Sequence, residues 1–287
     1  MLPDPATLVS ASTYRLFGVE IHPRNEHMST DVFDLTGQVA VITGGGTGIG
    51  RATAQVLAEH GADVVLASRR EENLEQTAAA IRGLGRTAVV KKTDVRKPEE
   101  CRALIETAHE EFGRIDILIN NAGGSKAFSF DEWTFEEFEN SIALNLRSFF
   151  FLSQSVLRHM VEQHSGNIVN ISSIASLTAM PGLGPYGMAK AGVNNLTRFL
   201  AAKYGVDNIR VNCIAPGFVG SDGFARAMKA VDRDPDDVAA QSNAMGRAGR
   251  PEEIALPILF LVSAASSFLS GETIYIGGGP PVVGPWS

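Results

Sequence analysis

The feature that most constrains the fold is a regular alternation of two kinds of segment. Seven apolar runs of strand length, rich in β-branched residues, recur along the chain. They cover residues 39–42, 64–67, 88–90, 115–119, 168–171, 211–215 and 274–276. Segments of helical period separate them, at residues 51–60, 73–82, 98–112, 135–164, 189–204 and 251–263. Strands that are apolar on both faces are typical of a covered parallel sheet. The alternation predicts an α/β fold, a doubly wound, Rossmann-like parallel sheet of about seven strands flanked by helices in a single domain.

The only domain boundary that the sequence indicates precedes the first apolar run, at residues 39–42. Residues 1–33 show little periodicity and are predicted to be an N-terminal extension, with the Rossmann-like domain at 34–287. Residues 220–249 lack a strand pattern and contain two short helical candidates, so they are predicted to form a lid over the ligand site.

Composition excludes several classes of protein. The net charge of −7 argues against a nucleic-acid partner, which usually requires a basic stripe. No apolar stretch is long enough to span a bilayer, and the N-terminus lacks the apolar core of a secretory signal. Two cysteines exclude a disulfide framework, and the six histidines show no metal-ligand spacing. We therefore expect a cytoplasmic protein without a metal, a membrane partner or a nucleic-acid partner.

A glycine-rich turn follows the first predicted strand and opens a helix. It reads T-G-G-G-T-G-I-G from Thr43 to Gly50. Glycines let the backbone approach a pyrophosphate, and the helix N-terminus offers free N–H groups to the anion. The turn predicts a dinucleotide site, although a glycine turn without a ligand is the alternative reading. The residues expected to hold the pyrophosphate are Gly44, Thr47, Gly48, Ile49 and Gly50.

The end of the second predicted strand indicates which nicotinamide cofactor binds. A site for NAD would place an acidic residue there, but the chain has Ser68, Arg69 and Arg70 instead, and Asp63 lies at the strand's start. A hydroxyl beside guanidinium groups suits a 2′-phosphate. The sequence predicts NADP(H) as the preferred cofactor with NAD(H) possible, and two solvated arginines are the alternative reading.

Tyr186 and Lys190 stand at i and i+4, which on a helix places both side chains on one face. Ser173, thirteen residues before Tyr186, follows the fifth predicted strand, where ligands bind in a doubly wound sheet. A serine at this place can contact a substrate oxygen, and Ser172 is the alternative serine.

Together these motifs resemble the short-chain dehydrogenase/reductase family over about residues 34 to 279. The run from Thr43 to Gly50 resembles the family's T-G-x-x-x-G-I-G cofactor motif, and residues 120–123 resemble its N-N-A-G motif. Asn145 is similar to the family's catalytic asparagine. Ser173 and the pair Tyr186 and Lys190 match its serine and its Y-x-x-x-K motif.

The resemblance implies a role for each matched residue. Tyr186 would exchange a proton with the substrate oxygen, its pKa lowered by the Lys190 ammonium and an oxidised nicotinamide. Ser173 would hold the substrate oxygen, and Asn145 would support a water chain leading to Lys190. The implied catalytic residues are Asn145, Ser173, Tyr186 and Lys190.

The resemblance also implies further contacts to the cofactor. Tyr186 and Lys190 would contact the nicotinamide ribose, and Asp94 would accept from the adenine amine, although a helix cap is the alternative reading of Asp94. The remaining implied cofactor contacts are Val95, Asn121, Ala122, Gly123, Pro216, Gly217, Val219 and Ser221. The chain departs from the family pattern at Ser221, where threonine is frequent, and before Gly277, where an aspartate is common.

The expected function is an NADP(H)-dependent oxidoreductase that interconverts a ketone and a secondary alcohol by hydride transfer. One alternative is an enoyl-CoA reductase of the same family. The other is a non-catalytic NADP-binding protein, and such a protein would be expected to lose one of the four catalytic residues. The resemblance further implies a homodimer or homotetramer, paired through the long helices that hold Asn145 and Lys190. Besides a second copy of the chain, the expected binding partner is a small carbonyl or alcohol substrate.

Overall fold

The computed structural model describes residues 14–16, 19–21, 32–230 and 232–280, and the chain divides into two units, Met1–Val32 and Phe33–Ser287. In the first unit, β1 (Tyr14–Leu16) and β2 (Val19–Ile21) pair as antiparallel strands, which the sequence pattern did not predict. The rest of the predicted extension up to residue 31, and residues 281–287, lie outside the described part of the chain.

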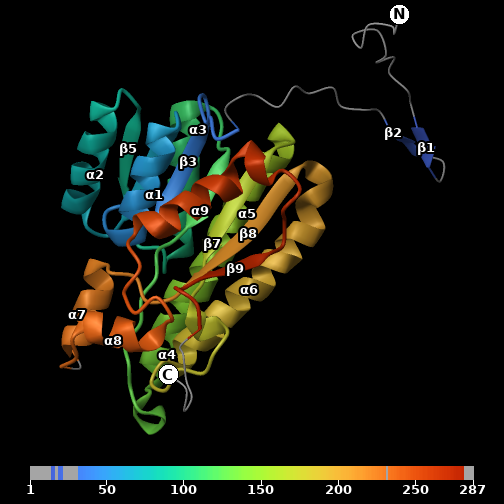
Figure 1. Cartoon of the computed structure of the whole chain (residues 1–287). Coiled ribbons are helices and arrows are strands. Elements are labelled where there is room, and N and C mark those ends of the chain that lie inside the picture. Colours follow the sequence, from blue (N-terminus) through green and yellow to red (C-terminus); the bar gives the residue numbers. More distant parts are fainter. Residues whose placement is uncertain (1–13, 17–18, 22–31, 231, 281–287) are drawn as a thin grey trace, which may run out of the picture. The chain divides into compact units, whose positions relative to one another are not determined.

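The second unit is built on one parallel sheet, as predicted. Its strand order is β5-β4-β3-β6-β7-β8-β9, with every neighbouring pair parallel (Figure 1). The strands are β3 (Val39–Thr43), β4 (Asp63–Ser68), β5 (Ala88–Lys92), β6 (Ile117–Asn120), β7 (Gly166–Ile171), β8 (Ile209–Pro216) and β9 (Thr273–Ile276). Each lies on one of the seven predicted apolar runs.

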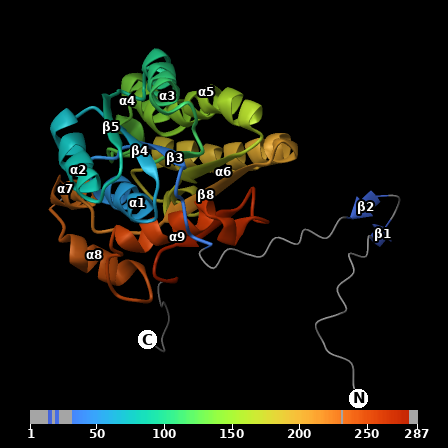
Figure 2. The same ribbon diagram turned by 90° about the horizontal axis from the view of Figure 1, so that it is seen from above.

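Helices cover both faces of this sheet, and each face has its own apolar core. One core combines strand residues with side chains from α1 (Gly48–Glu59), α2 (Glu71–Gly83) and α9 (Glu252–Val262). The other is covered by α3 (Pro98–Phe112), α5 (Ser148–Gln163) and α6 (Gly184–Tyr204) (Figure 2). The remaining helices are α4 (Phe135–Ile142), α7 (Asp222–Ala230) and α8 (Pro235–Ser242). Because helices cover the sheet on both sides, the central strands are apolar on both faces.

The strand order reverses between β3 and β6. The chain first builds outward from β3 to β4 and β5, then returns to place β6 on the other side of β3. In open α/β sheets a crevice forms at such a point, beyond the carboxyl ends of the strands. Here those ends carry the glycine turn after Thr43 and the segment after Asn120, so the fold brings two predicted cofactor segments together.

Two predicted helices differ most from their predicted bounds. The helix expected from 189 begins at Gly184, because Pro185 suits the first turn, where its missing N–H is not needed. The helix expected over 135–164 is divided into α4 and α5 by a π-helical turn at Ala143–Arg147. The segment expected as a lid contains α7 and α8. No helix in the described residues is both long enough and apolar enough to cross a membrane.

Candidate active site

The glycine turn between β3 and α1 is shaped so that only glycine fits at two of its positions. Gly44 has φ of +69°, and a Cβ there would lie 2.6 Å from Asn121 Nδ2. A Cβ at Gly50 would collide with the carbonyl oxygen of Gly44. Thr47 precedes α1 without capping it by its side chain, and the first turn has no acidic residue. The N-terminal N–H groups of α1 are therefore free of side-chain partners and fit a pyrophosphate.

The N-N-A-G segment after β6 holds this turn in place. Thr43 Oγ1 accepts from the backbone N–H groups of Asn121 and Ala122, at 3.0 and 3.1 Å. The Asn121 amide in turn donates to the Thr43 carbonyl at 2.8 Å. The Asn121 side chain is thus used to fix the glycine turn. Thr43 is a functional residue that the sequence reasoning did not single out.

The end of β4 carries the residues predicted to select the cofactor. Ser68 Oγ bonds to the backbone of Arg70, as donor to its carbonyl at 3.1 Å and acceptor from its N–H at 3.3 Å. Arg69 and Arg70 are exposed and have no ion pair within the described part of the chain. Asp63 lies at the opposite edge of the sheet, where it pairs with Arg86 at 3.0 Å. No carboxylate therefore occupies the place where an NAD site would need one.

Asp94 and Val95 follow β5. Asp94 is not the helix cap considered above, because Lys97 is the N-cap of α3. The Asp94 carboxylate is held by the Arg96 guanidinium, which also keeps the pKa of Asp94 below its ordinary value. Val95 is 6% exposed and packs into the core under α3, so its side chain points away from the surface.

Asn145 lies at the centre of the π-helical turn. Its side chain bonds to the N–H and the carbonyl of Gly124, at 3.1 and 2.9 Å. Its Nδ2 also donates to the Ser141 carbonyl at 3.0 Å, the group that the backbone N–H of Asn145 would bind in an α-helix. This competition accounts for the local π turn, a feature frequently found at functional sites.

Lys190 is 2% exposed, and its Nζ donates to the Ile171 carbonyl at 2.7 Å. Burial lowers the pKa of Lys190 to about 7. The ammonium also lies 4.4 Å from the centroid of the Phe149 ring, a contact that the sequence reasoning missed, although Phe149 follows Asn145 at helical spacing. A Cβ at Gly123 would be 3.0 Å from Asn145 Oδ1 and 3.4 Å from Lys190 Nζ, so both polar groups converge on Gly123.

The structure distinguishes the two candidate serines. Ser172 is 3% exposed, and its hydroxyl donates to the Lys190 carbonyl at 3.1 Å. The Ser173 hydroxyl instead accepts from the backbone N–H of Ala175 at 3.2 Å and is close enough to Tyr186 to lower the pKa of the phenol. The geometry therefore joins Ser173, and not Ser172, to the phenol.

The pKa of Tyr186 differs from the expectation. Burial raises it above the ordinary value, and Ser173 acts in the opposite direction without reversing the shift. The Lys190 ammonium lies 5.7 Å from the Tyr186 ring centroid and donates to a backbone carbonyl, so it does not offset the desolvation of the phenol.

The segment after β8 closes the site opposite the glycine turn. Gly217 N donates to the Ile276 carbonyl at 2.9 Å, and Pro216 is the last residue of β8. Val219 is 7% exposed and forms a bridge with Gly249. A Cβ at Gly48 would lie 3.1 Å from Ser221 Cβ. Residues 216–221 therefore face the turn that fits a pyrophosphate.

Comparison with known proteins agrees with this geometry. A family model described as enoyl-(acyl carrier protein) reductase matches residues 44–280. The short-chain reductase protein NovJ of Streptomyces niveus is 39% identical, with 88% of this chain and 97% of the relative covered. The chain belongs to the short-chain dehydrogenase/reductase family. Members of this family are dehydrogenases and reductases acting on CH–OH and C=O groups.

Two further relatives resemble this short-chain dehydrogenase/reductase almost end to end. Gluconate 5-dehydrogenase of Gluconobacter oxydans is 34% identical, with 87% of this chain and 96% of the relative covered. The solved structure of a 7α-hydroxysteroid dehydrogenase complexed with NADH and 7-oxo glycochenodeoxycholic acid superposes with a TM-score of 0.81. It is 35% identical, with 87% of this chain and 96% of that chain covered.

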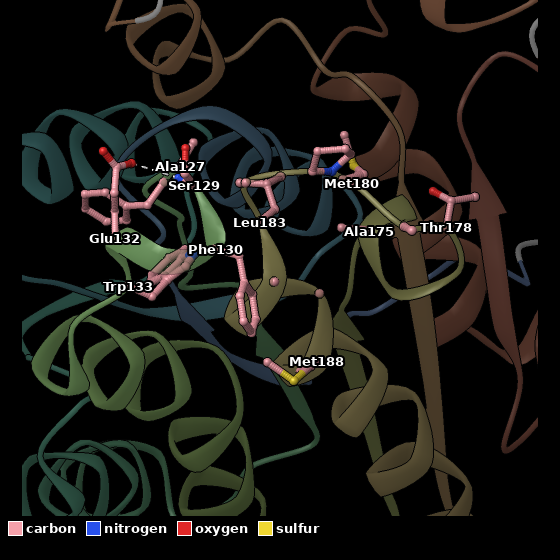
Figure 3. Close-up of a pocket in the computed structure, with 16 residues that line it drawn as sticks. Ala127, Ser129, Phe130, Glu132, Trp133, Ala175, Thr178, Met180, Leu183 and Met188 are labelled. Carbon is pink, nitrogen blue, oxygen red and sulfur yellow. Dashed lines mark hydrogen bonds between the residues drawn. The ribbon is translucent and has the colours of Figure 1, made fainter.

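A cavity of about 880 Å³ lies beside the candidate catalytic residues, between the segment 127–133 and the segment 175–188. Figure 3 shows the side chains around it, among them Trp133, Leu183 and Met188. Phe128 and Phe130 also line it. Tyr186 and Lys190 do not line this cavity, which Gly187 and Met188 border from α6.

Neither cysteine is a candidate nucleophile, because both are fully buried and burial raises the pKa of Cys101 to about 12 and that of Cys213 to about 11. Within the described ranges, no group of three or more His, Cys, Asp or Glu side chains is arranged to hold a metal ion.

Proposed function

We propose that this short-chain dehydrogenase/reductase interconverts a ketone and a secondary alcohol with NADP(H), using Tyr186 as the proton-transfer residue. The observation that carries the proposal is the grouping of Ser173, Tyr186 and the buried amine of Lys190: the Ser173 side chain is close enough to act on the Tyr186 phenol, and Lys190 Nζ lies 5.7 Å from the centroid of the Tyr186 ring. All three residues lie in the chain segment that follows β7, on the carboxyl side of the sheet, where the glycine turn fits a dinucleotide.

Each catalytic side chain has a physical task. Ser173 donates a hydrogen bond to the substrate oxygen, and Tyr186 gives that oxygen a proton during reduction or takes one during oxidation. A bound dinucleotide supplies or accepts the hydride. Because the pKa of Lys190 is about 7, its amine can both release and accept a proton near neutral pH. Lys190 and Tyr186 also bind the nicotinamide ribose, and Asn145 fixes the backbone at Gly124 beside the proton path.

The remaining predicted contacts divide between the two ends of the dinucleotide. We propose that the glycine turn, with Thr47 and Ile49 in its last residues, binds the pyrophosphate, while Pro216, Gly217, Val219 and Ser221 bind the nicotinamide end. Ala122 and Gly123 line the ribose side, and Asp94 accepts from the adenine amine although Arg96 also binds its carboxylate.

The preference for NADP(H) is supported by the absence of a carboxylate at the end of β4, where Ser68, Arg69 and Arg70 stand. Arg69 and Arg70 are exposed cations that can form paired bonds to a 2′-phosphate. NAD(H) is the alternative cofactor, and the steroid dehydrogenase relative complexed with NADH shows that a related fold binds it.

The enoyl reductase alternative is favoured by the description of the matching family model. Against it stands the Ser173–Tyr186 pair, because two hydroxyls at one oxygen serve the reduction of a C=O group directly. The names of gluconate 5-dehydrogenase and of the 7α-hydroxysteroid dehydrogenase, both dehydrogenases, also support chemistry at a hydroxyl-bearing carbon.

The protein is further proposed to form a homodimer or homotetramer in the cytoplasm, through α5 and α6. The exposed apolar side chains of Phe150, Met188 and Phe199 lie on these helices and suit an interface with a second copy. Residues 1–33 are proposed to be an extension of the catalytic domain, and residues 220–249 a lid over the substrate.

The substitution Tyr186→Phe tests the proposed function. It removes only the hydroxyl, so we expect the kcat for ketone reduction to fall by at least about 10³-fold while the NADPH dissociation constant changes by less than about threefold. Absorbance of NADPH across a panel of ketones, together with fluorescence titration of the cofactor, measures both quantities. Substantial turnover by the Tyr186→Phe variant would refute the assigned role. The matched control is Tyr204→Phe, which removes a hydroxyl at the opposite end of α6 from Tyr186.

A further inference from the structure

A second cavity, of about 420 Å³, lies at the carboxyl ends of β4 and β5. Most of the residues that line it are charged; the lining consists of Arg69, Lys91, Lys92, Asp94, Lys97, Glu100 and Ala103. Four of these residues are basic and two are acidic, in a chain whose net charge is −7. This cavity collects positive charge where the rest of the protein is acidic.

The two acidic residues of the cavity do not neutralise its excess charge, because each already has its own partner. Asp94 is paired with Arg96 at 2.5 Å, and Glu100 with Lys97 at 2.8 Å. In the parts of the chain that the structure describes, Arg69, Lys91 and Lys92 have no ion pair. Three cations without an ion pair at one cavity favour an anionic ligand.

The sheet register places one of these cations beside the cofactor-selecting residues. Lys92 is the register partner of Ser68, and Thr93 N donates to the Ser68 carbonyl at 2.9 Å. Neighbouring strands lie about 4.8 Å apart, so the four-carbon stem of Lys92 can reach a group bound at Ser68 and Arg69.

Lys91 is less suited to this task than Lys92. Its register partner is Ala67, which packs into the core beneath α3, and Lys91 is half-buried on that same face. Side chains alternate along a strand, so the exposed Lys92 shares the other face with Ser68. Arg69 is near enough to contribute to lowering the pKa of Asp94, after the larger effect of Arg96, which places its charge at the same cavity.

We propose that Lys92 and Arg69 together bind the 2′-phosphate of the dinucleotide, which makes Lys92 a specificity-determining residue of the cofactor site. The proposal rests on the NADP(H) preference proposed above. Arg69 supplies a planar group that matches two phosphate oxygens, and Lys92 supplies a second positive charge from the neighbouring strand.

The experiment compares the binding of 2′,5′-ADP and 5′-AMP, two probes that differ only in the 2′-phosphate and require no turnover. We expect the wild-type chain to bind 2′,5′-ADP at least about tenfold more tightly than 5′-AMP. Lys92→Gln should reduce that ratio about fivefold with no change for 5′-AMP, because a partly exposed ion pair contributes on this scale. Lys92→Arg should keep the ratio, as should Lys203→Gln, which removes an exposed lysine at the far end of α6.

Each other outcome has a distinct meaning. Equal binding of the two probes by the wild-type chain would refute the NADP(H) preference and this proposal with it. A wild-type preference that Lys92→Gln retains and Arg69→Gln removes would refute the role of Lys92 alone. The midpoint of thermal unfolding is measured for each variant. A midpoint equal to that of the wild-type protein shows that a change in the binding ratio comes from the lost charge and not from misfolding.

Discussion

Replacing Lys190 with Met should make this enzyme inactive and at the same time more stable. The lysine is 2% exposed, and burial lowers its pKa from 10.5 to about 7. At about 1.4 kcal/mol per pH unit, this difference corresponds to about 5 kcal/mol that disfavours the charged amine in the folded state. Methionine also removes the hydrogen bond to the Ile171 carbonyl, which costs about 1–3 kcal/mol. The net expectation near pH 6 is a gain of about 2 kcal/mol in the free energy of unfolding.

The gain must depend on pH with a defined sign. The folded pKa of Lys190 lies below the unfolded value, so the folded state binds fewer protons between about pH 7 and 10.5. The wild-type protein therefore becomes more stable as pH rises through this window, and Lys190→Met lacks that contribution. The advantage of the variant should be largest below pH 7 and shrink toward pH 10.5.

Urea unfolding of both proteins at one protein concentration, at pH 6, 7.5 and 9, measures this difference. Lys203→Met, at an exposed site on the same helix, is the control for general effects of the substitution. A variant that is less stable at every pH, or a stability difference that does not change with pH, would refute the assignment of a desolvated amine. The expected result means that the protein keeps Lys190 for function at the expense of stability.

Two further predictions follow from backbone and side-chain packing. Gly50→Ala should raise the dissociation constant for NADPH by at least about tenfold, measured by fluorescence titration, because the new Cβ collides with the Gly44 carbonyl; wild-type affinity would show that the turn can adapt. The rings of His159 and His109 are stacked with their centroids 4.2 Å apart. Burial lowers the pKa of His159, His109 lowers it further by a smaller amount, and Glu106 acts in the opposite direction without reversing the shift. The folded state therefore loses stability as pH falls below about 6.5, and His159→Phe should show a smaller decrease in thermal midpoint between pH 6.5 and 5; an equal decrease would place the acid sensitivity elsewhere.

The fold could be predicted from the sequence because its strongest signals are local. β-branched apolar runs and the segments of helical period between them correspond to the seven strands and the helices that cover them. The glycine turn, Ser68 to Arg70 and Ser173 could be placed from the ends of those strands, since a doubly wound sheet gathers its carboxyl ends at one edge. Tyr186 and Lys190 could be paired from their i, i+4 spacing on a helix.

What the sequence could not supply was set by side chains that compete for backbone groups. The π turn in the long helix exists because the Asn145 amide takes the Ser141 carbonyl, and no periodicity encodes that competition. The use of Asn121 to hold the Thr43 turn, and the partnership of Asp94 with Arg96, likewise depend on contacts between segments. The direction of the Tyr186 pKa shift depends on desolvation, which a sequence does not reveal.

The most direct test of the central claim is product analysis with an α,β-unsaturated ketone that the enzyme consumes together with NADPH. Because Ser173 and Tyr186 are proposed to bind and protonate a carbonyl oxygen, the account predicts reduction at C=O and an allylic alcohol as the product. A saturated ketone, formed by reduction of the C=C bond with the carbonyl intact, would contradict it.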